Sequence, residues 1–173
     1  MLDQKSEIAS FKLESCTTLP EFFTNSVRLY PNLEALRQFN KSSKTWESLT
    51  YQQLNEVISQ WRKAFASLDL PKGTRVGILM PNGIEHVCAD QAALANGLVP
   101  VPLHAIDTPG ASAFILSDSQ AKDLVTNNIN RWLKIAQANS ELPHLTHVIV
   151  TEAFDASQLN NDKIVLSLNE WLA

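Results

Sequence analysis

Residues 75–103, RVGILMPNGIEHVCADQAALANGLVPVPL, decide the fold class of this chain. The stretch opens with a nearly continuous apolar run over 75–80, which is too short for a helix and is typical of a parallel strand covered on both faces. Apolar and small side chains at helical spacing follow over 84–96, and Gly97 is suited to end that helix in a left-handed conformation. A second apolar run covers 98–103. This order predicts an α/β fold with a mostly parallel sheet and flanking helices.

The alternation of strands and helices continues toward the C-terminus. Thr108 followed by Pro109 predicts the start of a helix that runs to about residue 119, because the hydroxyl can cap the helix and proline suits its first turn. Further strands are predicted at 122–126 and 147–151, with a helix at 129–138 between them. Within 98–103, Pro100 and Pro102 each remove a backbone donor, so we expect this strand at an edge of the sheet.

The N-terminal third has its own signals. A short amphipathic helix is predicted over 19–30, followed by a hairpin with strands near 33–39 and 45–49. Thr50 and Gln53 then have the spacing of a capping box, in which each side chain bonds the other residue's backbone N–H. The apolar positions that follow predict a long core helix that reaches Leu68.

Composition indicates a soluble globular chain with one domain: 173 residues, of which 45% are hydrophobic. We divide it into a flexible N-terminal segment, residues 1–18, and one domain, residues 19–173. The polar stretch 154–163 is predicted to be a mobile loop. A net charge of −4 without clusters of Lys or Arg argues against a nucleic-acid partner. The N-terminus lacks the apolar run of a signal peptide or membrane span, which predicts a cytoplasmic protein.

Few residues stand out as chemical candidates. The five glycines form neither a dinucleotide-binding motif nor a P-loop. Cys16 and Cys88 suggest no disulfide framework, and we expect Cys88 to be a buried free thiol. His144 and His147 lack neighbouring ligands in the sequence, so we assign no metal-binding residue.

His104 and Asp107 are the candidates for a ligand passage. His104 follows the 98–103 strand, and the carboxyl ends of parallel strands are where open α/β sheets bind ligands. Asp107 precedes a predicted helix, where capping and solvation would also explain an aspartate. Replacement of His104 by alanine, with no change in the Michaelis constants of the ligands, would remove His104 from the passage.

Three blocks of the sequence together resemble a known family. Residues 50–54 (TYQQL), 72–82 (KGTRVGILMPN) and 92–103 (AALANGLVPVPL) resemble the start of the AMP-binding, adenylate-forming enzymes. The following DTPG at 107–110 is most similar to the long-chain fatty acid–CoA ligase branch. The resemblance covers about residues 19–151 and implies the N-terminal subdomain of an adenylate-forming enzyme.

The resemblance implies a parent enzyme that uses Mg and ATP to convert a fatty acid to an acyl-AMP, and then transfers the acyl group to CoA. The family's Ser/Thr/Gly-rich ATP loop should follow a segment like 164–172, and the chain stops at Ala173. We therefore expect no catalytic residue in this fragment, no tight binding of ATP, Mg or CoA, and no activity in isolation.

The expected partners are the fatty acid substrate and the remainder of the same enzyme. An apolar face left uncovered would favour self-association. Peripheral membrane attachment of the full-length form stays open.

Two alternatives remain. The parent enzyme could be a fatty acyl-AMP ligase or the adenylation domain of a peptide or polyketide assembly line, which would not use CoA as acceptor. The chain could also be a stand-alone flavodoxin-like binding or regulatory module. That module would have a well-covered sheet without a large exposed apolar face.

Overall fold

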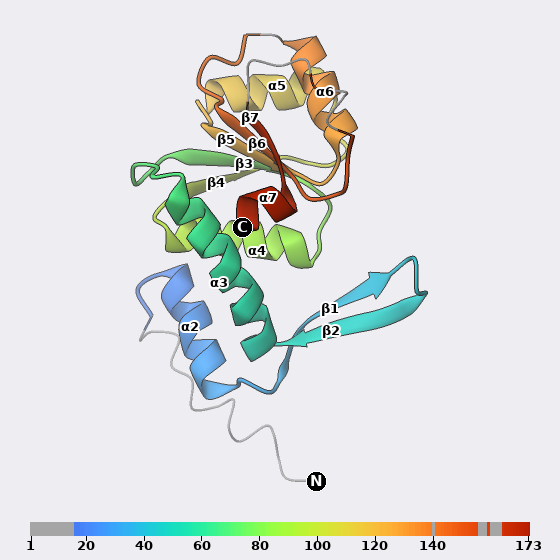
Figure 1. Ribbon diagram of the computed structural model, residues 1–173. Helices are drawn as coiled ribbons and strands as arrows, with labels where there is room; N and C mark the ends of the chain where they lie inside the picture. Colours follow the sequence, from blue (N-terminus) through green and yellow to red (C-terminus); the bar gives the residue numbers. More distant parts are fainter. Residues whose placement is uncertain (1–15, 140, 156–158, 160–163) are drawn as a thin grey trace.

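A five-stranded parallel sheet lies at the centre of the fold (Figure 1). The structure, a computed structural model, describes residues 16–139, 141–155, 159 and 164–173. The strands lie in the order β4 (Val99–Pro102), β3 (Arg75–Leu79), β5 (Asp123–Thr126), β6 (His147–Val150) and β7 (Ile164–Ser167). All neighbouring strands in it are parallel, so the predicted fold class is confirmed.

Helices cover both faces of the sheet (Figure 1). On one face lie α5 (Pro109–Asp118) and α6 (Ile129–Ala138), and on the other lie α3 (Tyr51–Ser67), α4 (Ile84–Ala95) and α7 (Leu168–Leu172). We call these the α5–α6 face and the α3–α4–α7 face. Strand side chains alternate between them, because successive residues of a strand point to opposite faces. Val125 packs in the core of the α3–α4–α7 face, and Leu124 in the core of the α5–α6 face.

Aromatic rings and small residues fill the core of the α3–α4–α7 face. Trp171 of α7 packs edge-on against Trp61 and Phe65 of α3, with ring centroids 5.3 and 4.7 Å apart. The sequence pattern predicts no element at 164–172, where the structure has β7 and α7. On α4, the buried residues are small, which lets the helix lie close to the sheet: Cys88, Ala89, Ala92 and Ala93.

The predicted buried thiol is confirmed. Cys88 is free and buried on α4. Burial, and to a smaller extent the charge of Glu85, raises the pKa of the Cys88 thiol to about 12. The thiolate, which is the reactive form, is therefore strongly disfavoured at neutral pH.

The N-terminal elements have the predicted types. They are α2 (Leu19–Leu29) and an antiparallel hairpin of β1 (Glu34–Asn40) and β2 (Thr45–Thr50), which projects from the body of the fold (Figure 1). The capping box of α3 is present: Thr50 Oγ1 accepts the Gln53 N–H, and Gln53 Oε1 accepts the Thr50 N–H at 2.9 Å. The hairpin reaches α4 through Gln38, whose Oε1 accepts the Ile84 N–H at 2.8 Å.

The two edges of the sheet differ. β4 forms one edge, as its prolines predict. The N–H groups of Val99 and Leu103 point inward and donate to carbonyls of Thr74 and Ile78 at 2.9 Å. The alternate positions, Pro100 and Pro102, therefore face outward, and neither has an N–H to offer. β7 forms the other edge and contains no proline.

Two further predictions concern residues with little structural description. Most of the predicted flexible segment 1–18 and much of the predicted mobile loop 154–163 lie outside the described residues. Within the part of the chain that the structure describes, no helix combines the length and apolar character needed to cross a bilayer.

Candidate functional site

A cavity of about 420 Å³ opens at the carboxyl ends of β3 and β5, beside the α5–α6 face. From β3 the chain crosses first to β4 on one side and then returns to β5 on the other, so the direction of strand order reverses between β3 and β5. Open α/β sheets bind ligands at such switch points. The walls of the cavity come from β3, from the start of α5, from the turn after β5 and from α6: Leu79, Asp107, Pro109, Ser112, Asn127, Asn128, Asn130, Arg131, Lys134 and Ile135.

The end of β5 and the start of α6 are fixed by hydrogen bonds. Thr126 is buried, and its hydroxyl donates to the Leu79 carbonyl at 2.9 Å, which joins the ends of β5 and β3. Asn128 caps α6, because its Oδ1 accepts the Asn130 N–H at 2.9 Å. The amides of Asn127 and Asn128 donate to the two carboxylate oxygens of Glu152, at 2.6 and 2.8 Å. These bonds hold the cavity wall in one arrangement.

Two cations on α6 give the cavity a positive side. Arg131 and Lys134 lie three residues apart, and residues at this spacing share one face of a helix. Arg131 is half-buried and its Nη1 donates to the Ala105 carbonyl at 2.7 Å, whereas Lys134 is exposed. Among the described residues neither forms an ion pair with a carboxylate. Together with the positive end of α6, they favour an anionic ligand.

The two candidates that the sequence suggested, His104 and Asp107, differ in their position relative to the cavity. Asp107 lines the cavity, and its Oδ2 accepts the His104 N–H at 3.2 Å, while the Asp107 N–H donates to the His104 carbonyl at 3.0 Å. The His104 side chain is exposed and is not part of the cavity wall. Helix α5 is capped by Thr108, as predicted, whose Oγ1 accepts the Ala111 N–H at 3.3 Å. The assignment of both residues to a ligand passage stays a prediction.

Sequence reasoning missed Asn127, Asn128, Arg131 and Lys134. The signal that could have found them is their position, because the two asparagines directly follow a strand and Arg131 and Lys134 lie on the next helix. The rule that ligands bind at carboxyl ends of strands was applied to His104 and applies equally after β5.

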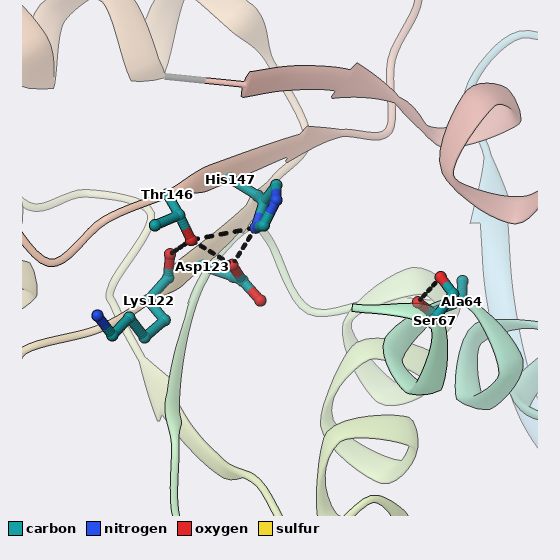
Figure 2. Close-up of polar contacts among 6 residues, drawn as sticks. All are labelled: Ala64, Ser67, Lys122, Asp123, Thr146 and His147. Carbon is teal, nitrogen blue, oxygen red and sulfur yellow. Dashed lines mark hydrogen bonds and ion pairs between the residues drawn. The ribbon is translucent and has the colours of Figure 1, made fainter. Parts of the chain in front are cut away.

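The two histidines considered for metal binding lie in different places. His147 Nδ1 lies 2.9 Å from Asp123 Oδ1, at the amino ends of β6 and β5 (Figure 2). His144 lies beside a small hollow with Ser117 and Leu142. Within residues 16–139, 141–155, 159 and 164–173, no three His, Cys, Asp or Glu side chains form a group that could hold a metal ion.

Comparison with known proteins supports a family assignment. The sequence profile of the family described as AMP-binding enzyme matches residues 23–170. A long-chain-fatty-acid–CoA ligase, ACSBG2 of Xenopus laevis, is 29% identical over 132 residues, which cover 76% of this chain and 18% of that protein. The long-chain-fatty-acid–CoA ligase FadD13 of Mycobacterium tuberculosis is 35% identical over 77 residues, 44% of this chain and 15% of that protein. The chain thus spans less than a fifth of these relatives.

Solved structures of ligases and synthetases are also similar to this chain. A Mycobacterium tuberculosis fatty acyl CoA synthetase matches with a TM-score of 0.67 and 25% identity, over 76% of this chain and 26% of that one. The anthranilate CoA ligase AuaEII in complex with anthranoyl-AMP matches with a TM-score of 0.73 over 88% of this chain and 27% of that one. At 22% identity, the second likeness concerns the fold alone.

Proposed function

Because this chain belongs to the AMP-binding enzyme family, we propose that it is the N-terminal subdomain of a long-chain fatty acid–CoA ligase. The observation that carries the proposal is the family match over 23–170, together with relatives that are long-chain-fatty-acid–CoA ligases. In the proposed reaction, a fatty acid carboxylate attacks the α-phosphorus of Mg-ATP, and pyrophosphate leaves. The CoA thiol then attacks the acyl carbonyl, and AMP leaves.

The cavity suggests what this subdomain contributes. ATP and CoA both carry several phosphates, and the cavity offers Arg131 and Lys134 of α6, two cations that form no ion pair within the described part of the chain. We propose that these groups hold a phosphate of one of the two cosubstrates. Arg131 is also held by the Ala105 carbonyl, so its guanidinium is partly positioned before any ligand arrives. Lys134 is the better residue to test, because the described residues give its side chain no such hydrogen bond.

Catalysis would need parts of the enzyme beyond these residues. The described residues contain no glycine-rich phosphate loop, since the chain has only five glycines and none of them forms such a motif. We therefore propose that the chain alone does not form acyl-AMP and that the remainder of the enzyme completes the site.

The decisive experiment is ATP–pyrophosphate exchange with palmitate, followed by detection of palmitoyl-CoA. It would be run on this chain and on the full encoded protein that contains it. Exchange and thioester only with the full protein are expected. Exchange without thioester would favour a fatty acyl-AMP ligase or another adenylating enzyme instead.

No exchange with either protein would favour the binding-module alternative. One observation is in keeping with that alternative, since the strand order β4-β3-β5-β6-β7 is the order of flavodoxin-like folds. Fold alone does not decide function, and the family match favours the ligase.

The cavity is tested separately by Lys134→Gln in the full protein. Loss of one charge-assisted hydrogen bond, worth about 1.5–3 kcal/mol, should raise the Michaelis constant of ATP or of CoA about tenfold or more. Lys63→Gln is the matched control, because Lys63 is exposed on α3 on the other side of the sheet. Unchanged constants for both cosubstrates would remove the cavity from the proposed site and leave the ligase assignment standing.

A further inference from the structure

A second polar cluster lies at the amino ends of β5 and β6, opposite the end that carries the cavity. Asp123 and His147 are neighbours in the register of the two strands. His147 Nδ1 lies 2.9 Å from Asp123 Oδ1, and Thr146 Oγ1 lies 3.1 Å from His147 Nδ1 and 3.4 Å from Asp123 Oδ1 (Figure 2). The Thr146 hydroxyl also bonds the Lys122 carbonyl at 3.0 Å.

Asp123 is an unusual residue for this position. Its side chain is fully buried, and its second oxygen, Oδ2, has no hydrogen-bond partner among the residues that the structure describes. An ionised carboxylate without its full set of partners is strongly disfavoured in a protein interior. Burial accordingly raises the pKa of Asp123, and the bonds from His147 and Thr146 and the charge of Lys122 offset only part of that effect.

The surroundings of the pair are otherwise apolar. Across from Asp123, β3 places Val76, and across from His147, β7 places Ile164. The buried residues of α3, α4 and α7 on this face are apolar. Among the described residues, the ionisable groups that act on the carboxyl are therefore His147 and Lys122, and of these two His147 lies within hydrogen-bond distance of it.

We propose that Asp123, Thr146 and His147 form a proton-sharing lock between β5 and β6. The folded chain keeps a proton on the Asp123 carboxyl at pH values where the unfolded chain has already lost it. The proton spares the buried carboxyl a negative charge. Its loss leaves a buried carboxylate, one oxygen of which has no hydrogen-bond partner among the described residues, so the fold loses stability as the pH rises.

The sign of the effect follows from linkage. A carboxyl whose pKa is raised in the folded state binds its proton more tightly there than in the unfolded chain. Its contribution to stability is fully present below the unfolded value, 3.8 for aspartate, and is lost as the pH rises through the folded-state value. Three exposed carboxyls with lowered pKa act in the opposite sense, and their contribution is lost as the pH falls through their folded-state values, below 4.5: Glu21, Glu34 and Glu170. Measurements above pH 5 therefore exclude these three carboxyls, and the comparison of wild type with Asp123→Asn cancels the contribution of the Cys88 thiol, whose raised pKa acts in both proteins.

The test is urea unfolding of the whole chain between pH 5 and 9. The wild-type midpoint should fall as the pH rises, with about a tenfold loss in the ratio of folded to unfolded chains for each unit by which the cluster's proton affinity is raised. Asp123→Asn keeps the shape without the charge and should abolish this slope. His144→Gln removes a histidine outside the cluster and should keep it.

A measurement on the wild type removes the dependence on variants that fail to fold. The carboxyl carbon of Asp123 is followed by NMR as the pH is varied. Titration at a pH above the ordinary aspartate value of 3.8 is expected, because burial raises the pKa of this carboxyl. A carboxyl that titrates alone near 3.8, or equal slopes for wild type and Asp123→Asn, would overturn the proposal.

Discussion

The two faces of the parallel sheet differ in what lies against them. On the α3–α4–α7 face, large aromatic rings meet small helix residues, and the core contains Trp61, Phe65 and Trp171. On the α5–α6 face, the core ends near the carboxyl ends of the strands, where a cavity with polar side chains in its walls opens. Close packing supports stability, and an open polar hollow supports binding. We therefore expect substitutions on the first face to act on folding and those at the cavity to act on ligands.

Trp171→Ala should produce the largest effect. Trp171 is buried and makes edge-on contacts with Trp61 and Phe65, so its truncation removes apolar contacts and leaves a cavity. A loss of about 3–5 kcal/mol in the free energy of unfolding is expected. Urea denaturation followed by circular dichroism measures it. Trp46→Ala is the control, because Trp46 is 66% exposed on the hairpin and should change stability far less.

Equal losses for the two tryptophan variants would break the comparison between the faces. They would mean that the projecting hairpin contributes as much to stability as the α3–α4–α7 core. That outcome would show that the burial of Trp171 is not the cause of the stability lost in Trp171→Ala.

Gly77→Ala should have an intermediate effect. Gly77 lies in β3, and a Cβ added there would lie 2.6 Å from Leu116 Cδ2 of α5 and 3.3 Å from Leu124 Cδ1. Overpacking of this kind costs about 1–3 kcal/mol. The variant sharpens the comparison, because it shows how closely α5 lies against the sheet on the cavity side. Thermal unfolding provides the readout.

Gly110→Ala is the matched glycine control. Gly110 lies in the first turn of α5, and a Cβ there would meet no atom within 4 Å. Alanine should leave stability unchanged or raise it by up to about 1 kcal/mol. A loss at Gly110 equal to that at Gly77 would show that packing against Leu116 is not the cause.

Lys134→Ala should have the smallest effect on folding. Lys134 is exposed at the cavity, and its side chain forms no hydrogen bond or ion pair with another described residue. The free energy of unfolding should therefore change by less than about 0.5 kcal/mol. A clear loss of stability would place Lys134 among the residues that support the fold, and would remove the separation between packing and binding.

Local patterns predicted much of the fold. The apolar run at 75–80 became β3, the Thr50 and Gln53 pair formed the capping box of α3, and Pro100 and Pro102 correctly indicated an edge strand. These signals succeed because each depends on neighbours in the sequence: side-chain periodicity, a cap three residues away, or a missing N–H.

The rest depends on contacts between distant residues. Trp171 meets Trp61 across 110 positions of the chain, and no periodicity within 164–172 reveals that partner. Asp123 and His147 meet because β5 and β6 pair in one register, which the sequence of either strand alone does not specify. Residues from three separate stretches of the chain form the cavity, so it could be inferred only from the general rule on carboxyl ends.

The unequal edges of the sheet also limit how copies of this chain could assemble. The outward positions of β4 are prolines, so that edge cannot donate to a neighbouring strand, whereas β7 has no proline. A growing fibre needs, on every copy, two sheet edges that can form hydrogen bonds to a neighbouring strand. Two copies that met through β7 would each use the one edge of the five-stranded sheet that can donate along its length, and the pair would have a twofold axis. Association through the edges of the five-stranded sheet should therefore stop at a dimer.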